Sequence, residues 1–329
     1  MAIDNAFFRG KVCMVTGGGG SIGSEIARQL SRLGAEKIVI ADIYENGAYD
    51  VKNEIGSAAV VEIASVRDYD KMNYIMSEYL PDIIIHAAAH KHVPFMESNP
   101  EEAVKNNIKG TEIMAGLAEK NRADNFLLIS TDKAVEPISV MGASKRICEM
   151  LVYEKSLYSP HTKFTAVRFG NVLNSNGSVI PLFKKQLESG VITVTDKDVT
   201  RYFMTTAEAA ELALGSLTIA EGGEIFVLDM GADVKILDIA EKIIRGAGKI
   251  PYEEVKIEFT GLRKGDKLHE KLFYDFEKCE KTRYDKILRV EGSGTDNLIV
   301  SVGMLYEMAA KNDRGGIREL IFKAAAGKI

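Results

Sequence analysis

The sequence predicts an α/β protein with a Rossmann-type doubly wound parallel sheet and a smaller C-terminal α/β lobe. Two observations carry this prediction. Short, continuous apolar runs, typical of strands buried on both faces, alternate with helix-length segments from the start of the chain. A glycine-rich turn separates the first apolar run from the first helical segment. Such alternation is typical of parallel sheets that are covered by helices on both faces.

Six β-branched runs are predicted to be strands, at residues 11–16 (KVCMVT), 37–42 (KIVIAD), 59–64 (AVVEIA), 82–87 (DIIIHA), 125–130 (NFLLIS) and 164–170 (FTAVRFG). The main helices are predicted at residues 21–33, 68–79, 100–122 and 140–156. Because the pattern changes after Gly170, we place a first domain at residues 1–170 and a second lobe at residues 171–329.

In the second lobe, residues 171–183 are rich in Asn, Ser and Gly and are predicted to form a long connection that lines a site. A strand near residues 224–229 can rejoin the main sheet. Residues 234–248 predict an amphipathic helix that stops at glycine. Residues 256–273 predict a strand, a basic turn and a helix.

Composition narrows the class of protein. The chain has 329 residues, of which 46% are hydrophobic and 27% charged, with a net charge of −5. This balance gives no basic face, so we expect no nucleic-acid partner. No apolar run reaches membrane-spanning length, so we expect a cytoplasmic protein without membrane insertion. The odd number of distant cysteines, Cys13, Cys148 and Cys279, is typical of buried structural thiols in a reducing compartment.

The glycine-rich turn predicts a dinucleotide site. Gly17, Gly20 and Gly23 lie between an apolar run and a helical segment that includes Ser21 and Ile22. Glycine permits a tight turn and close backbone approach, and the helix N-terminus offers free N–H groups to a pyrophosphate. Asp42 ends the next apolar run, where a carboxylate accepts the ribose hydroxyls of NAD and repels the 2′-phosphate of NADP. NAD is therefore favoured over NADP.

Further contacts to the cofactor are predicted after the third and fourth strands, from Arg67, Asp68, Ala87, Ala88 and Ala89. Three histidines near the alanine run, His86, His90 and His92, raise the alternative of a metal site. Because no carboxylate or cysteine accompanies them, we predict no metal.

A resemblance is carried by the stretches TGGGGSIGSE, HAAAHKHVP, NNIKGT, STDKAVEPISVMGASKR, VRFGNVL, GSVIPLFKKQ, TRYFM and GLRKGDKLHEKL. They resemble nucleotide-sugar 4,6-dehydratases of the extended short-chain dehydrogenase group. More narrowly, they are similar to the UDP-N-acetylglucosamine 4,6-dehydratases of polysaccharide biosynthesis. The resemblance implies transient oxidation at C4, elimination of water across C5 and C6, and hydride return to C6. It also implies a homo-oligomer, either a dimer or a hexamer.

The resemblance implies that Asp132 is the acid towards the C6 hydroxyl and Lys133 the base at C5. For these roles we expect burial to raise the pKa of Asp132, and desolvation or nearby cations to lower the pKa of Lys133. Met141 stands where short-chain dehydrogenases carry a tyrosine, and Lys145 follows it by one helical turn. Lys145 is expected to bind the nicotinamide ribose.

Without the tyrosine, the C4 proton needs another route. The hypothesis is that Thr131, water and the Asp132–Lys133 pair provide it, and that Met141 packs against the sugar or the nicotinamide. By resemblance, Asn107 supports the active site and Lys91 is a candidate cofactor contact.

The resemblance also implies the residues that bind a nucleotide-sugar substrate. Asn171 is expected to reach the diphosphate or sugar, and Ser178 and Val179 to present backbone to the nucleoside. Arg201 and Arg263 are candidates for the diphosphate, because guanidinium groups bind phosphate oxygens bidentately. Glu270 is a candidate for the nucleoside ribose. Uridine is favoured as the nucleoside, and guanosine remains an alternative.

Two other functions stay open. A nucleotide-sugar 4-epimerase shares the fold and cofactor, but epimerases keep the tyrosine and have no need of an Asp-Lys pair. A non-catalytic NAD-binding sensor or scaffold protein would explain Met141 but gives Asp132 and Lys133 no purpose. Retention or inversion at C5 does not follow from the sequence.

Overall fold

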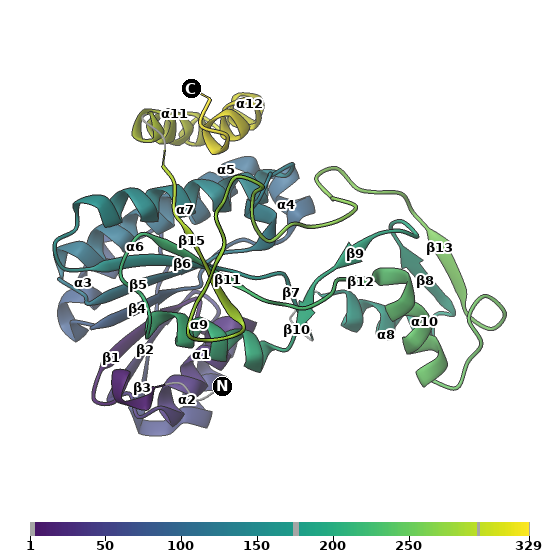
Figure 1. Ribbon diagram of the computed structural model, residues 1–329, viewed down its shortest axis with the longest axis horizontal. Helices are drawn as coiled ribbons and strands as arrows, with labels where there is room; N and C mark the ends of the chain where they lie inside the picture. Colours follow the sequence, from purple (N-terminus) through teal and green to yellow (C-terminus); the bar gives the residue numbers. More distant parts are fainter. Residues whose placement is uncertain (1–3, 174–177, 295–296, 329) are drawn as a thin grey trace.

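A largely parallel sheet forms the centre of the protein. The computed structural model describes residues 4–173, 178–294 and 297–328. Within these residues, nine strands form a sheet in the order β14-β15-β11-β6-β5-β4-β1-β2-β3 (Figure 1). The parallel strands are β1 (Val12–Thr16), β2 (Lys37–Asp42), β3 (Ala59–Ile63), β4 (Ile83–His86), β5 (Asn125–Ile129), β6 (Lys163–Arg168) and β11 (Glu224–Leu228). Two antiparallel strands, β15 (Ile287–Glu291) and β14 (Glu280–Lys281), complete one edge. The predicted doubly wound fold is confirmed, and the strand near residues 224–229 rejoins the sheet.

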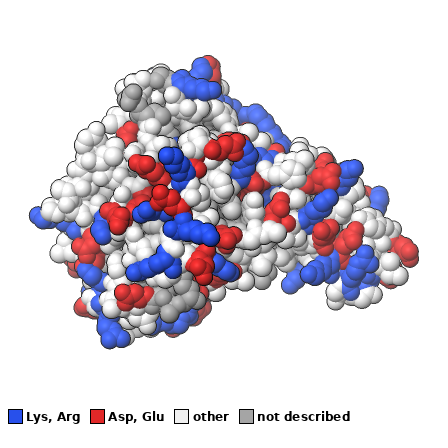
Figure 2. All heavy atoms as spheres, viewed as in Figure 1, with Lys and Arg blue, Asp and Glu red and all other residues white. Residues whose placement is uncertain are grey.

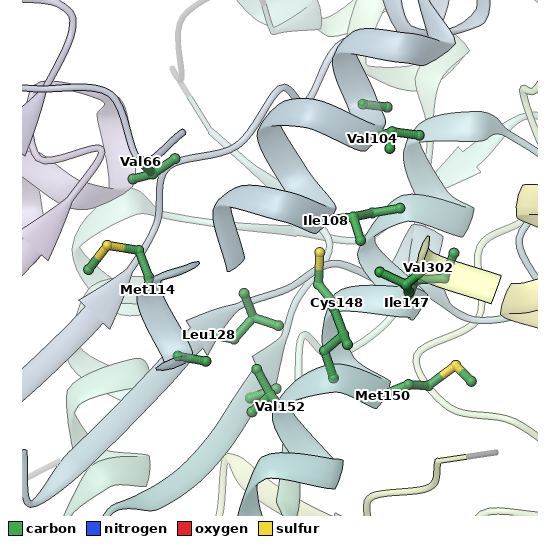
Figure 3. Packing of buried hydrophobic residues seen from close by; sticks show 14 of the residues in the cluster. Val66, Val104, Ile108, Met114, Leu128, Ile147, Cys148, Met150, Val152 and Val302 are labelled. Atoms are coloured by element: carbon green, nitrogen blue, oxygen red, sulfur yellow. The ribbon is translucent and has the colours of Figure 1, made fainter. Parts of the chain in front are cut away.

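Helices cover both faces of the sheet and enclose two apolar cores (Figure 1). One face carries α1 (Ser21–Arg32), α2 (Glu45–Ile55) and α9 (Thr206–Leu217). The other carries α3 (Tyr69–Tyr79), α6 (Lys109–Lys120) and α7 (Val140–Tyr158). Helices α11 (Leu298–Ala310) and α12 (Arg314–Ala325) pack on the outer side of this layer, against α5, η3 and α7. Figure 3 shows Ile147, Cys148 and Val152 of α7 in this second core, together with Ile108 and Leu128.

Short helical segments lie in the connections. They are η1 (Asn5–Phe7), η2 (Gly56–Ala58), α4 (Val93–Ser98), α5 (Pro100–Glu102), η3 (Ala103–Ile108) and η4 (Asp132–Ala134). The helix predicted over residues 100–122 is therefore α5 and α6 joined by η3, which is a π-helical turn. A π-helical turn inside a helix is rare and frequently found at functional sites.

A smaller lobe extends beyond the carboxyl edge of the sheet (Figure 1). It contains α8 (Val179–Glu188), β8 (Val191–Val194), α10 (Ile236–Gly246) and β13 (Lys256–Phe259), which share a separate apolar core. Two short strand pairs join it to the main body: β7 (Asn171–Val172) with β10 (Phe203–Met204), and β9 (Thr200–Arg201) with β12 (Val234–Lys235). The chain then returns to the main body through β14, β15, α11 and α12.

Two predictions in the second lobe were wrong. The connection predicted over residues 171–183 contains β7 and the first turns of α8, while residues 174–177 lie outside the described part of the chain. The helix predicted at the end of residues 256–273 does not form. The carbonyl of Leu268 instead accepts from the backbone N–H of Thr200 and from Arg201. These bonds to β9 take the place of bonds within a helix.

The surface carries charges of both signs, intermixed across the face in view in Figure 2. Cys13 and Cys148 are buried, as expected, but Cys279 is exposed, so the expectation of a buried thiol was wrong there. Across the described ranges, none of the helices combines the length and apolar character that crossing a membrane requires.

A buried ionic cluster ties α7 to the end of β6. Arg168 donates from Nε and Nη2 to the two carboxylate oxygens of Glu149, both at 2.8 Å, and from Nη1 to Glu277 at 2.8 Å. The Arg168 and Glu149 side chains are 0% exposed. Ser130 and Arg146 also donate to Glu149, at 2.7 and 3.2 Å. Burial opposes ionisation of Glu149, but Arg168 and Arg146 outweigh it and lower the pKa of Glu149.

We predict that Glu149→Gln destabilises the protein by about 3–5 kcal/mol, because it leaves the buried Arg168 without its main counter-charge. Unfolding by urea, followed by circular dichroism, measures the loss. Glu119→Gln is the control. It breaks a partly exposed ion pair between Glu119 of α6 and Lys155 of α7, the helix that also carries Glu149. A loss for Glu149→Gln no larger than for the control would contradict the prediction.

Candidate functional site

The direction of strand addition reverses between β1 and β4, which opens a crevice at the carboxyl edge of the sheet. The loop after β1 approaches the segment after β4 very closely. Gly17 has a φ of +69°, and a Cβ atom there would lie 2.7 Å from the backbone nitrogen of Ala88. A Cβ atom on Gly23 would overlap the carbonyl oxygen of Gly17. Any larger residue at either position would therefore force the loop, the start of α1 and residues 87–89 apart.

This loop and Asp42 fit the pyrophosphate and ribose of a dinucleotide. Helix α1 begins at Ser21, and Gly20 precedes it without a side-chain cap. The first-turn N–H groups, including that of Ile22, have no partner within a helix. Asp42 lies beside the loop and accepts from the backbone N–H groups of Gly19 and Tyr44, at 2.8 and 2.9 Å. The glycines let the loop pack tightly against residues 87–88 and the start of α1, and the Asp42 carboxylate is bonded to this loop.

The other residues that the sequence predicted for the cofactor have different surroundings. Ala87, Ala88 and Ala89 line the crevice next to Gly17. Arg67 and Asp68 have protein partners instead: Arg67 donates to Glu102 at 2.7 Å, and Asp68 caps α3. Lys91 is exposed in the segment before α4.

His86 is a structural residue. It is 1% exposed, and its ring nitrogens lie 2.8 Å from the hydroxyl of Thr16 and 3.1 Å from that of Thr111. Burial, with a smaller effect of Lys145, lowers the pKa of His86 to about 3, so the ring is neutral. Among the described residues, the side chains of His, Cys, Asp and Glu form no group of three that could hold a metal ion.

Asn107 links the crevice to α7. From the π-helical turn η3, its amide donates to the carbonyl of His90 at 3.1 Å and to Ser144 of α7 at 3.0 Å. Its oxygen accepts from the N–H of His90 at 2.8 Å. Met141 and Lys145, on the same helix, are 3% and 4% exposed. Burial lowers the pKa of Lys145, against the opposing influence of its neighbours on α7.

Buried Asp132 and partly exposed Lys133 form an ion pair at the carboxyl end of β5. Lys133 donates from Nζ to Asp132 Oδ1 at 3.0 Å, and Thr131 donates to the same oxygen at 2.9 Å. Asp132 is 0% exposed, and its Oδ2 has no hydrogen-bond partner among the described residues. This oxygen faces Gly170, where an added Cβ atom would lie 2.9 Å away. A Cβ atom on Gly142 would overlap the carbonyl oxygen of Lys133, so α7 begins directly against the pair.

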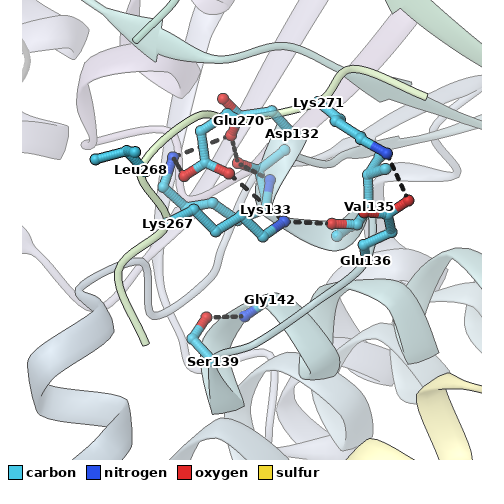
Figure 4. Close-up of polar contacts among 12 residues, drawn as sticks. Asp132, Lys133, Val135, Glu136, Ser139, Gly142, Lys267, Leu268, Glu270 and Lys271 are labelled. Atoms are coloured by element: carbon cyan, nitrogen blue, oxygen red, sulfur yellow. Dashed lines mark hydrogen bonds and ion pairs between the residues drawn. The ribbon is translucent and has the colours of Figure 1, made fainter. Parts of the chain in front are cut away.

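The surroundings of Lys133 differ from the expectation. Its Nζ also donates to Asn171 Oδ1 at 3.3 Å and lies 3.5 Å from Glu270 Oε1 (Figure 4). Burial favours the neutral amine, but the charges of Asp132 and Glu270 outweigh it and raise the pKa of Lys133. The expectation of a lowered pKa was wrong, because the sequence does not show that a second carboxylate reaches this amine.

The residues predicted for the substrate do not all gather in one place. Asn171 and Glu270 join the Asp132–Lys133 pair. Arg201 lies 3.8 Å from Glu270, but its guanidinium also donates to the carbonyls of Thr200, Leu268 and Lys267. Arg263 is exposed and pairs with Asp266 at 2.8 Å. Ser178 and Val179 form the start of α8 in the lobe.

Sequence reasoning missed Lys267. Its amine donates to the carbonyl of Val135 at 2.5 Å and lies 3.6 Å from Glu270 Oε2 (Figure 4). The high density of charged residues in GLRKGDKLHEKL was the available signal.

Comparison with known proteins finds relatives in polysaccharide biosynthesis. CapD of Staphylococcus aureus, a capsular polysaccharide biosynthesis protein, is 48% identical over 88% of this chain and 49% of its own length. EpsC of Bacillus subtilis, a probable polysaccharide biosynthesis protein, is 50% identical over 85% and 48%. The chain thus spans about half the length of these two relatives.

Two relatives of similar length have different activities in their names. UDP-N-acetylglucosamine 4,6-dehydratase (inverting) of Campylobacter jejuni is 32% identical over 82% of each chain. UDP-glucose 4-epimerase of Rickettsia bellii is also 32% identical, over 88% of this chain and 85% of its own.

Solved structures share the fold. Pen from Bacillus thuringiensis has a TM-score of 0.81 at 32% identity and covers 87% of this chain and 90% of its own. DesIV, a dTDP-glucose 4,6-dehydratase of Streptomyces venezuelae solved with NAD, has a TM-score of 0.71 at 20% identity, over 79% and 88%. The sequence model described as "Polysaccharide biosynthesis protein" matches residues 13–292. The chain therefore belongs to this polysaccharide biosynthesis family, whose relatives include nucleotide-sugar dehydratases and epimerases.

Proposed function

We propose that the protein is a nucleotide-sugar 4,6-dehydratase that converts UDP-N-acetylglucosamine to a UDP-4-keto-6-deoxy-N-acetylhexosamine. The observation that carries the proposal is the ion pair of buried Asp132 with partly exposed Lys133, which stands at the same edge of the sheet as the glycine loop. Elimination of water needs an acid and a base held side by side, and this pair supplies both. The Campylobacter jejuni relative supports the choice of substrate by its name.

NAD, when bound, would supply the oxidation at C4 and return the hydride to C6. The N-terminus of α1 would hold its pyrophosphate, and Asp42 its adenosine ribose. The alanines after β4 leave room for the cofactor to lie close to the sheet edge. Lys145 would hold the nicotinamide ribose from α7.

In the elimination, the Lys133 amine takes the C5 proton once C4 is a ketone. Asp132 delivers a proton from Oδ2, the oxygen without a protein partner, to the departing C6 hydroxyl, which leaves as water. C5 is reprotonated when C6 receives the hydride, so the net change is the loss of one water. The C4 hydroxyl proton would leave through Thr131 and the same pair, because Met141 cannot accept it.

A 4-epimerase is the second candidate, favoured by the name of the Rickettsia bellii relative at equal identity. Epimerisation needs no acid at C6 and does not explain the Asp132–Lys133 pair. Incubation with NAD and UDP-N-acetylglucosamine, followed by mass spectrometry, separates the two. Loss of water supports the dehydratase, whereas a product of unchanged mass supports the epimerase. If no product forms, the remaining explanations are a non-catalytic NAD-binding protein or an enzyme with another substrate.

The stereochemistry is read from the same reaction. In heavy water, reprotonation should place deuterium at C5, and NMR of the product then shows whether that centre is retained or inverted.

We predict that Asp132→Asn lowers kcat for loss of water by about 10²–10⁴-fold, the usual contribution of a positioned acid or base. The amide cannot deliver the proton, and NAD binding should persist because Asp132 lies outside the glycine loop. The control is Asp124→Asn, which changes an exposed carboxylate just before the start of β5. Equal turnover by Asp132→Asn and the control would remove Asp132 from the reaction.

We predict that Asp42→Asn weakens NAD binding about tenfold or more, in line with loss of a hydrogen bond to a charged group. Because the charge that repels a 2′-phosphate also disappears, the preference for NAD over NADP should fall. Isothermal titration calorimetry with each dinucleotide measures both effects. Asp50→Asn, at an exposed position on α2, is the control. An unchanged Kd for NAD in Asp42→Asn would refute the assignment.

A further inference from the structure

A short segment from the second lobe lies across the Asp132–Lys133 pair. We call residues 267–271 the strap. On one side it is bound to β9, where the N–H of Thr200 donates to the carbonyl of Leu268 at 3.1 Å. On the other side it is bound to the chain after η4: Lys267 donates to the carbonyl of Val135, and Lys271 to Glu136 at 2.9 Å (Figure 4). The strap thus joins the lobe to the segment that carries the pair.

Glu270 carries the carboxylate of the strap, and this carboxylate points towards Lys133. Its side chain is 2% exposed. Oε1 lies 3.5 Å from Lys133 Nζ and 3.8 Å from Arg201 Nε, and Oε2 lies 3.6 Å from Lys267 Nζ. A buried carboxylate must be compensated by nearby positive charge, and three cations surround this one.

The Lys133 amine donates to two oxygens, Asp132 Oδ1 and Asn171 Oδ1, and forms an ion pair with Glu270 Oε1 at 3.5 Å. The amine thus stands between two carboxylates, and the ammonium form supplies a positive charge to both. A neutral amine would remove that charge and leave Asp132 without its ion-pair partner. The arrangement around Lys133 therefore favours a bound proton, yet the proposed elimination needs this amine to accept one.

We propose that Glu270 is a positioning residue, which fixes the Lys133 amine against Asp132 and Asn171 and sets the pH range in which that amine accepts a proton. This inference rests on the proposed function, because it gives Lys133 the role of base. It differs from the ribose contact expected from the sequence, since Glu270 acts here on a catalytic side chain. Through Glu270, the strap would make the protonation of the Lys133 amine depend on the position of the lobe.

Glu270→Gln tests the inference, because it removes the charge and keeps the shape. A base works only when neutral, so activity rises with pH through the pKa of Lys133. Removal of a carboxylate at this distance should lower that pKa by about 1–3 units and move the rising limb of the kcat profile equally far to lower pH. The KM for the nucleotide sugar should change much less than for loss of a direct substrate contact.

The titration of Lys133 is also read without turnover. In protein with ¹³C-labelled lysine, the Cε signal of Lys133 is assigned by its absence in Lys133→Arg, and its midpoint is followed by NMR. Glu270→Gln should lower the midpoint, while Lys267→Met, which removes a nearby cation, should raise it. Glu280→Gln, which breaks an exposed pair with Arg289, is the control and should leave the midpoint unchanged.

The possible failures are distinct. An unchanged Lys133 midpoint in folded Glu270→Gln would overturn the inference, as would a large rise in KM with an unchanged pH profile, the result expected of a ribose contact. If Glu270→Gln does not fold, the upward shift in Lys267→Met decides, and its absence overturns the inference. A shifted midpoint in a protein that never eliminates water would refute the proposed function and leave the action of Glu270 on Lys133 standing.

Discussion

The burial of Glu149 against Arg168 is the interaction on which the geometry of the centre depends. Each end of this ion pair leads directly to a functional segment. Ser130, bonded to Glu149, comes just before Asp132, and Arg168 ends β6 just before Asn171. Glu277, the second partner of Arg168, follows the strap by a few residues. An ion pair without access to water has few alternative arrangements. The segments around Ser130, Arg168 and Glu277, which are distant in sequence, are therefore held in fixed positions relative to one another.

Much of the architecture could be predicted because its causes are local. Continuous apolar runs indicated the parallel strands of the nine-stranded sheet, and glycine spacing indicated the tight loop between β1 and α1, beside Asp42. The failures have tertiary causes. The carbonyl of Leu268 bonds to β9 and not within a helix, and Glu270 reaches Lys133 from a segment far along the chain. The pKa of Lys133 follows from that approach, so its direction could not be obtained from the residues beside it.

The two candidate functions share a first step and diverge after it. Oxidation at C4 needs the cofactor crevice, which the dehydratase and epimerase alternatives both require. The later steps depend on which side chains stand near C5 and C6. Under the proposed function those positions fall to Asp132 and Lys133, whose neighbours are Asn171 and Glu270. The assignment therefore depends on a few side chains at the rim and not on the sheet.

The absence of a side chain at Gly142 has a mechanical consequence. Helix α7 touches the backbone of Lys133 with no intervening atoms, and Asn107 clamps the same helix to the segment after β4. Helix α7, the backbone of Lys133 and the segment after β4 are thereby packed as a single block. The lobe meets this block at the β7–β10 strand pair and through the strap, whose Lys267 and Lys271 bond to the chain after η4.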